Sequence, residues 1–380
     1  MKTLVSLLVL PVLLLLDGAH PAGAQETYKI GGVFSITGPA SYFGEDQRNT
    51  MLLLQDQINA RGGINGKKLE VIVYDDATDP TKAVTALKRL HEDDKVLAVI
   101  GASLSGNTLG MIPFTEKSGI PQLANAASGK ISSPVKKWVY QFCNTDVQSI
   151  ARILQFLQAR GIKKIAMLND STGYGVSGKE ELERQAPGKG FEVAAWETFD
   201  ANDTDMTPQL TRIKVTGAQA VIVWNGTPAS AIIAKNFKQL GLTALQIQST
   251  AFVSPRLLSL AGDAADGIIL TGYKLPIVDT LPSTDPQKKI ITEFRDAYVK
   301  RFGKEPNPFG ALTQDAFTAL VKVLETAGSD REKIRAGLEQ LKGFLGANGI
   351  YTTSAADHNG YAVDSLQMLV VEKGKFRLVH

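Results

Sequence analysis

The chain has 380 residues, 44% of them hydrophobic, with 41 basic and 38 acidic residues and a net charge of +3. This length and apolar content suit two ordinary domains with their own cores and exclude a disordered chain. The balanced charge, without a basic block, argues against a nucleic-acid partner, and the single cysteine, Cys143, excludes an intramolecular disulfide and a metal cluster held by several cysteines.

Residues 1–24 have the pattern of a secretory signal peptide. Lys2 supplies a short positive region, Leu4–Leu16 is an apolar stretch, and residues 22–24 (Ala-Gly-Ala) match the small-residue cleavage pattern. A membrane anchor is the alternative, but this stretch is too short to cross about 30 Å of hydrocarbon. We therefore expect an exported protein whose mature chain begins at Gln25. No cysteine lies near the cleavage site, which excludes a lipid-anchored lipoprotein.

Short apolar runs rich in β-branched residues then alternate with segments of helical periodicity. The runs lack polar alternation, which is typical of strands buried on both faces of a parallel sheet. They are Tyr28–Phe34, Leu69–Tyr74, Leu97–Ile100, Ile165–Leu168, Ala220–Trp224 and Gly267–Leu270. Gln148–Arg160 and Phe317–Leu324 space their apolar residues three and four apart, which predicts helices with one buried face. The alternation predicts right-handed βαβ units with helices on both faces of each sheet.

This β/α pattern occurs twice, over residues 28–143 and 145–272. After Tyr273 it changes to a stretch rich in proline and aspartate, Leu275–Gln287, followed by three predicted helices and a tail of extended segments. Two similar α/β lobes fit this organisation. Composition alone does not assign the last hundred or so residues to either lobe.

Motifs that would support catalysis are absent. The sequence has no H-E-x-x-H, G-x-S-x-G or P-loop pattern, and away from the chain ends only His91 and His358 remain as bases for a hydrolase. We expect Cys143 to be a buried structural thiol. Asp75-Asp76 at a strand end could suggest a metal or acid–base site, but helix capping and rim charge are the simpler interpretation. The sequence therefore predicts a protein that is not an enzyme and holds no cofactor or metal.

Two small, polar loops follow predicted strands in the first half of the chain. Residues 102–108 (ASLSGNT) precede a helical segment, and residues 125–129 (NAASG) follow the next strand. In open α/β sheets ligands bind outside the carboxyl ends of strands, and a helix N-terminus with free N–H groups suits an anion. Ser105 adds a hydroxyl donor, and Gly106 lets a ligand approach the backbone. From the residues alone, an anion site and ordinary turn chemistry stay equally open.

The order of these features resembles the periplasmic branched-chain amino-acid-binding proteins of ABC transporters, the type I solute-binding family. The match spans nearly all of the mature chain, so it is specific, although its individual pieces are not. The matching stretches are Gly38-Pro39, Tyr42-Phe43-Gly44, Ile58–Gly66, Tyr74-Asp75-Asp76, Asp79-Pro80, Val99-Ile100-Gly101, Gly119-Ile120-Pro121, Tyr174-Gly175 and Ala261–Gly267.

The resemblance implies an α/β fold of two Rossmann-like lobes with parallel sheets, joined by three crossovers that form a hinge. The crossovers are expected near Cys143–Asp146, Tyr273–Pro276 and Asn348–Tyr351. The N-terminal lobe would then comprise residues 25–144 and 275–348, and the C-terminal lobe residues 145–274 and 349–380. Such a protein closes over a small solute and delivers it to an inner-membrane ABC permease; a monomer is expected.

The resemblance also implies where the solute binds. First-lobe loops would hold its carboxylate, and aromatic residues from both lobes would close over it. The loop positions are Ser103, Leu104, Ser105, Ala126, Ala127 and Ser128, and the closing aromatics are Phe43 and Tyr174. Further positions expected around the solute are Tyr42, Trp224, Thr227, Thr250 and Phe252, with Thr227 or Pro228 where the family has a tyrosine.

One departure from the family concerns the amino group of the solute. Amino-acid-binding members pair the ammonium with an acidic residue shortly before the Ala261–Gly267 motif, where a gap-free count finds Thr250 here. No Asp or Glu occurs between Asp205 and Asp263, and a buried ammonium without a counter-charge costs several kcal/mol. We therefore expect a carboxylate without an amino group, an aromatic acid such as a benzoate derivative or an aryl 2-oxo acid. The alternatives are a branched-chain or other hydrophobic amino acid, or a role as a periplasmic sensor subunit.

Overall fold

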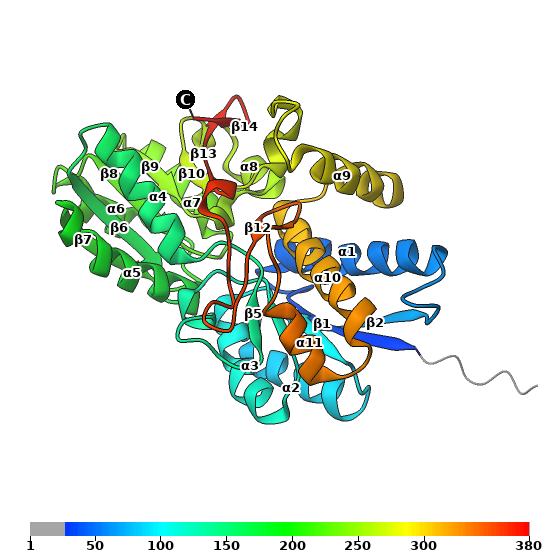
Figure 1. Ribbon diagram of the computed structural model, residues 1–380. Helices are drawn as coiled ribbons and strands as arrows, with labels where there is room; N and C mark the ends of the chain where they lie inside the picture. Colours follow the sequence, from blue (N-terminus) through cyan, green and yellow to red (C-terminus); the bar gives the residue numbers. More distant parts are fainter. Residues whose placement is uncertain (1–26, 380) are drawn as a thin grey trace, which may run out of the picture.

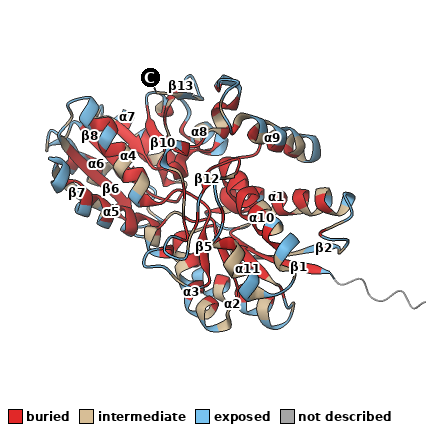
Figure 2. Ribbon diagram, in the orientation of Figure 1, coloured by how far each residue is buried: buried red, intermediate tan, exposed pale blue. Residues whose placement is uncertain are grey.

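The computed structural model describes residues 27–379, so the predicted signal peptide, residues 1–24, lies outside the described part of the chain. Two α/β lobes lie side by side, the first coloured mainly blue to cyan and the second mainly green (Figure 1). Buried residues concentrate in the sheets and in the centre of the molecule, and exposed ones on the outer helix faces (Figure 2). None of the helices within residues 27–379 is long and apolar enough to span a membrane.

The first lobe holds a five-stranded parallel sheet in the order β2-β1-β3-β4-β5. The strands are β1 (Tyr28–Phe34), β2 (Leu69–Asp75), β3 (Ala98–Gly101), β4 (Gln122–Ala124) and β5 (Val139–Gln141). Helices α1 (Ser41–Ala60), α2 (Pro80–Glu92) and α3 (Ser105–Ser118) connect the first four. Every residue of β3, β4 and β5 is buried, which explains apolar runs without polar alternation.

The second lobe holds a seven-stranded sheet in the order β14-β13-β10-β9-β8-β6-β7. Its parallel strands are β6 (Lys164–Asp170), β7 (Glu192–Phe199), β8 (Ala220–Trp224), β9 (Leu245–Gln248) and β10 (Ile269–Gly272). Their helices are α4 (Asp146–Ala159), α5 (Gly173–Gln185), α6 (Thr207–Lys214), α7 (Ala229–Gln239) and α8 (Pro255–Ala261). The order β7-β6-β8-β9-β10 repeats that of the first sheet, so the predicted duplication and fold class are confirmed.

The C-terminal residues divide between the lobes. Helices α9 (Lys288–Phe302) and α10 (Pro308–Ala327) pack on α1, and α11 (Arg331–Leu338) packs on α10. Strands β13 (Gln367–Glu372) and β14 (Lys375–Leu378) instead extend the second sheet, antiparallel to their neighbours, so that sheet is not wholly parallel. A short hairpin of β11 (Phe344–Leu345) and β12 (Ile350–Tyr351) lies between these two groups along the chain.

The segment after β12 stays with the first lobe for longer than expected. The amide of Gln141 in β5 donates to the carbonyl of His358 at 2.9 Å, and the His358 ring stacks on Tyr140 with centroids 4.3 Å apart. Asn359 Nδ2 donates to the carbonyl of Cys143 at 2.8 Å. We therefore propose that the third connection follows Gly360, about ten residues after the predicted one, with the lobe boundary moved accordingly.

A buried carboxylate holds the hairpin that precedes this connection. Asp315 of α10 accepts hydrogen bonds from the amides of Ala347, Asn348 and Gly349 at 2.6, 2.9 and 3.0 Å. The hydroxyl of Tyr351 donates to the same carboxylate at 3.0 Å. Burial raises the pKa of Asp315 to about 7, while these four donors favour the charged form. The side chain thereby fixes the chain where it approaches the second lobe.

Candidate ligand-binding site

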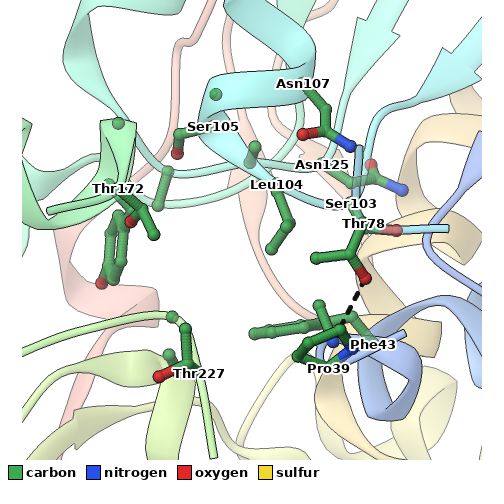
Figure 3. A pocket seen from close by; sticks show the side chains of 18 of the residues that line it. Pro39, Phe43, Thr78, Ser103, Leu104, Ser105, Asn107, Asn125, Thr172 and Thr227 are labelled. Carbon is green, nitrogen blue, oxygen red and sulfur yellow. Dashed lines mark hydrogen bonds between the residues drawn. The ribbon is translucent and has the colours of Figure 1, made fainter. Parts of the chain in front are cut away.

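A cavity of about 460 Å³ lies between the two lobes. Its walls are built from the segments that follow the carboxyl ends of the five first-lobe strands and of β6 to β10 in the second lobe, together with α10. Both lobes thus follow the rule that ligands bind at this edge of an open α/β sheet. Figure 3 shows Ser105, Leu104 and Phe43 of the first lobe and Thr172 and Thr227 of the second around the open space.

The predicted site residues divide into two groups. Those that line the cavity are Phe43, Ser103, Leu104, Ser105, Ala126, Ala127, Tyr174, Thr227 and Thr250. Those that do not are Tyr42, Ser128, Trp224 and Phe252, all of which are buried beside it.

These four side chains have other contacts. Tyr42 lies against the Phe43 ring, with centroids 4.2 Å apart. Trp224 is fully buried and packs behind Tyr174, with ring centroids 5.3 Å apart, and Phe252 is fully buried in the core. The hydroxyl of Ser128 lies 2.7 Å from that of Ser177 on α5 rather than facing the cavity.

Several lining residues were not predicted from the sequence. They are Pro39, Ala40, Ala77, Thr78, Asp79, Pro80, Asn107, Asn125, Cys143, Thr172, Gly173, Ala201, Asn202, Gly226, Ala251, Tyr273, Phe309 and Leu312. Most of them directly follow a strand, so the strand-end rule applied to every strand would have found them. Phe309 and Leu312 belong to α10 and carry no such local signal.

The N-terminus of α3 is the feature of the cavity that suits an anion. Leu104 occupies the N-cap position and has no side-chain acceptor, and the amides of Ser105, Gly106 and Asn107 donate no hydrogen bond within residues 27–379. Ser105 is buried, and its Oγ accepts from the amide of Ser128 at 3.2 Å, which leaves the hydroxyl proton free. Free amides, a hydroxyl donor and the positive end of the helix dipole together suit a carboxylate.

The hydroxyl of Ser103, in contrast, forms its hydrogen bonds with other groups of the protein. Its Oγ accepts from the amide of Ser35 at 3.0 Å and donates to Gln47 Oε1, so no proton remains for a solute. Asp76, which is fully buried, accepts from the Ser35 hydroxyl at 2.7 Å and from Asn107 Nδ2 at 2.8 Å. Burial raises the pKa of Asp76, and these hydrogen bonds lower it. This network positions the loop that starts α3.

Helix capping was the wrong interpretation of the paired aspartates, while rim charge fits Asp75, which is exposed, but not Asp76, which is buried. The N-cap of α2 is Asp79, which accepts from the amides of Thr81 and Lys82. Asp75 instead accepts from the amide of Ile36 at 2.9 Å, and Asp76 is buried as described above. Within residues 27–379, no group of three or more His, Cys, Asp or Glu side chains is arranged to hold a metal ion.

None of the described second-lobe residues that line the cavity is charged. Asp79 of the first lobe is the one charged residue among those that line the cavity in the described chain. Asp170 lies beneath the second-lobe wall, but its oxygens accept from the amides of Thr172 at 3.0 Å and Gly226 at 2.9 Å and from the Thr172 hydroxyl. At the position expected for an ammonium partner, Thr250 Oγ1 lies 3.4 Å from the hydroxyl of Tyr174. The polar groups on this wall are therefore neutral.

The remaining wall is largely apolar. Phe43 and Phe309 meet edge to face, with centroids 4.1 Å apart and planes at 63°, and Leu104 and Leu312 lie beside the same space. Tyr273 closes the hinge end, where its hydroxyl donates to Asn144 Oδ1. A solute with one carboxylate and an apolar body matches this lining.

The lobes touch across the cavity, so the structure is closed. Gly173 in the first turn of α5 approaches α3 so closely that a Cβ on it would lie 3.1 Å from the Cα of Gly106. Lys130 of the first lobe also forms a salt bridge with Glu180 of α5. Cys143 lines the closed cavity and is buried, and burial raises the pKa of its thiol.

We predict that Gly173→Ala prevents this closure. The added Cβ would meet backbone atoms of Gly106 at 3.1 and 3.2 Å, while alanine suits a helix start, so the separate lobes keep their stability. Cys143 should then react faster with N-ethylmaleimide than in the wild type. Gly106→Ala is the matched control, because its Cβ meets only the Gly173 nitrogen, at 4.0 Å. Equal reaction rates in Gly173→Ala and the wild type would contradict the prediction.

Comparisons with known proteins agree with this architecture. A family model described as periplasmic binding protein matches residues 27–375. The chain is 29% identical over 324 residues to the leucine-, isoleucine-, valine-, threonine-, and alanine-binding protein of Pseudomonas aeruginosa, covering 83% of each chain. It is 26% identical over 333 residues to Leu/Ile/Val-binding protein homolog 1 of Brucella suis, covering 87% of this chain and 85% of that protein.

Solved structures give the same result. An extracellular ligand-binding receptor from Rhodopseudomonas palustris HaA2 superposes with a TM-score of 0.88 at 27% identity, covering 93% of this chain and all of that one. A periplasmic binding protein type 1 from Bordetella pertussis Tohama I gives a TM-score of 0.84 at 26% identity, covering 93% of this chain and 100% of the other.

Proposed function

Because the chain belongs to the periplasmic binding protein family, we propose that it is the exported solute-binding protein of an ABC importer. It captures a small carboxylate with an apolar body between its lobes and presents it to an inner-membrane permease. The observation that carries this proposal is the uncapped N-terminus of α3, with its free amides and the Ser105 hydroxyl, inside a closed interlobe cavity. The relatives named above are binding proteins, which supports binding without catalysis.

A hydrophobic amino acid is the solute that the comparisons favour. The Pseudomonas aeruginosa and Brucella suis relatives are named for binding leucine, isoleucine and valine. Phe43, Leu104, Phe309 and Leu312 provide an apolar surface of the kind that a branched side chain needs. The sequence alone favours an aromatic acid over a hydrophobic amino acid, whereas the comparisons favour the amino acid.

A carboxylate without an amino group is the second candidate, favoured by the charges of the cavity. An ammonium buried at the second-lobe wall would face the hydroxyls of Tyr174 and Thr250, with no acidic side chain among the lining residues there. Leaving a buried charge unpaired costs several kcal/mol, and an affinity near 1 μM corresponds to only about −8 kcal/mol. An aromatic acid avoids this cost, and Phe43, Phe309 and Tyr174 can contact its ring.

The transport and sensor alternatives share this binding step. A sensor subunit would present the closed lobes to a membrane receptor instead of a permease. Membership of the periplasmic binding protein family favours transport over sensing, so we propose the inner-membrane permease of an ABC importer as the partner.

A thermal-shift screen on unfolded and refolded protein tests the solute class, since refolding removes any solute that purifies with the chain. The panel is leucine, valine, glutamate, benzoate, 4-hydroxybenzoate, benzoylformate and 3-phenylpyruvate. A solute at about 100 times its Kd adds roughly 2.7 kcal/mol of stability, a shift of a few degrees. We expect a shift with leucine and valine or with the aromatic acids, and none with glutamate. No shift with any hydrophobic carboxylate would contradict the proposed function.

Thr250→Glu separates the two candidates. A carboxylate side chain at this wall should attract the ammonium of leucine and repel an aromatic acid, so the ratio of the two Kd values should move towards leucine by roughly tenfold or more. Thr250→Val is the matched control, because it removes the hydroxyl without adding charge. Isothermal calorimetry of the three proteins measures this ratio. A ratio that is the same in Thr250→Glu as in Thr250→Val would mean that position 250 does not face the solute's amino group.

A further inference from the structure

A chain of buried hydrogen bonds joins the two lobes next to the cavity. Ser128 of the first lobe and Ser177 of α5 have their hydroxyl oxygens 2.7 Å apart, and the Ser177 hydroxyl donates to Asp146 Oδ2. All three side chains are at most 5% exposed. A hydroxyl has one proton, and that of Ser177 goes to the carboxylate, so Ser128 must be the donor in the serine pair. The bonds therefore run from Ser128 through Ser177 to Asp146.

Asp146 anchors this chain at the hinge. It is the first residue of α4, directly after the chain first crosses between the lobes, and it packs in the same lobe as Ser177. Its other oxygen, Oδ1, accepts from the amide of Gly129 at 2.9 Å. One second-lobe carboxylate thus holds two successive first-lobe residues, Ser128 through Ser177 and Gly129 directly.

Ser128 also contacts the group that faces the solute. Its amide donates to Ser105 Oγ at 3.2 Å, and this bond directs the free Ser105 proton away from Ser128. The first turn of α5, which carries Gly173, meets α3 beside Ser105. The serine pair therefore connects the closed position of α5 to the orientation of a solute-binding hydroxyl.

We propose that Ser128, Ser177 and Asp146 form a latch that assembles only when the lobes close and that holds Ser105 ready for the solute. The latch rests on the proposed function, because solute capture is the step that it assists. When the lobes separate, Ser177 stays with Asp146 and water replaces it at Ser128. On closure the pair is desolvated and ends on a charged acceptor, which strengthens the bond. Ser128 and Ser177 are positioning residues and do not touch the solute.

The test is Ser177→Ala, which leaves the Ser128 hydroxyl without its acceptor in the closed state alone. Leaving the buried Ser128 hydroxyl without an acceptor in the closed state should shift the ratio of closed to open molecules by roughly 5- to 150-fold. Cys143, the single cysteine of the chain, lines the closed cavity and is buried, so its rate of reaction with N-ethylmaleimide measures the open population. The rate is measured without solute, with saturating L-leucine and with saturating benzoylformate.

The expected result is faster labelling of Ser177→Ala than of the wild type in at least one condition. The urea-unfolding free energy of Ser177→Ala should also fall, because the buried carboxylate of Asp146 loses a donor in both the open and the closed state. Ser128→Ala keeps that bond, so it should label faster with little change in the urea-unfolding free energy. Ser230→Ala is the matched control, because Ser230 is a buried second-lobe serine whose hydroxyl donates to Asn225 Oδ1 within its own lobe. It should not alter the labelling rate. Ser128→Ala should reproduce the effect of Ser177→Ala, and the double variant should add little to either.

Two results would overturn the latch. One is equal labelling of the wild type and Ser177→Ala in all three conditions; the other is full additivity of the two serine substitutions. A wrong solute assignment gives a different result: neither L-leucine nor benzoylformate would then slow the labelling of Cys143 in the wild type. In that case the labelling rates without solute test the latch. Equal solute-free rates for Ser177→Ala and the wild type would contradict it.

Discussion

The unpaired amides at the start of α3, buried between two lobes that touch, are the constraint on which the rest of the site depends. The Leu104 side chain at the N-cap cannot accept a hydrogen bond, so the amides of Ser105 and Gly106 need an acceptor from outside the helix. A buried donor without a partner costs about 1–3 kcal/mol, and water supplies that partner while the lobes are open. Closure removes the water, so an anion that takes its place stabilises the closed state.

The buried carboxylates around the cavity cannot serve as that anion, because each already binds donors of the protein. Asp76 accepts from Ser35 and Asn107 and shapes the loop before α3. Asp146 accepts from Ser177 and Gly129 at the hinge, and Asp170 accepts from Thr172 and Gly226 under the second-lobe wall. The two lobes share one topology yet differ at this point, since Thr172 and Asp170 satisfy the start of α5 while α3 is left open. The proposed anion site therefore belongs to the first lobe, and the second lobe supplies neutral hydroxyls and apolar surface.

Much of the fold could be predicted from the sequence because most strands are buried on both faces and appear as unbroken apolar runs. Two of the strands missing from that set show why: β7 is an edge strand with mixed exposure, and β9 carries the buried polar residues Gln246 and Gln248. The position of Ser105 at the start of α3 and in the cavity was predictable, because the position of a loop between a strand and a helix follows from chain order. The roles of Ser103 and Ser128 were not, since their hydroxyls bond to Gln47 and Ser177, which only the packing of α1 and α5 brings near.

The central claim is that the start of α3 binds the carboxylate of the solute, and replacing that carboxylate tests it most directly. Isothermal calorimetry of the refolded protein would compare L-leucine with L-leucinamide and benzoylformate with benzoylformamide. The amide keeps the shape and the apolar body but loses the charge that the helix terminus and the Ser105 hydroxyl favour. We predict that the acid that binds has a Kd roughly 5- to 150-fold lower than that of its amide. A difference of this size is expected from the loss of one charge-assisted hydrogen bond. An amide that binds as tightly as its acid would contradict the account.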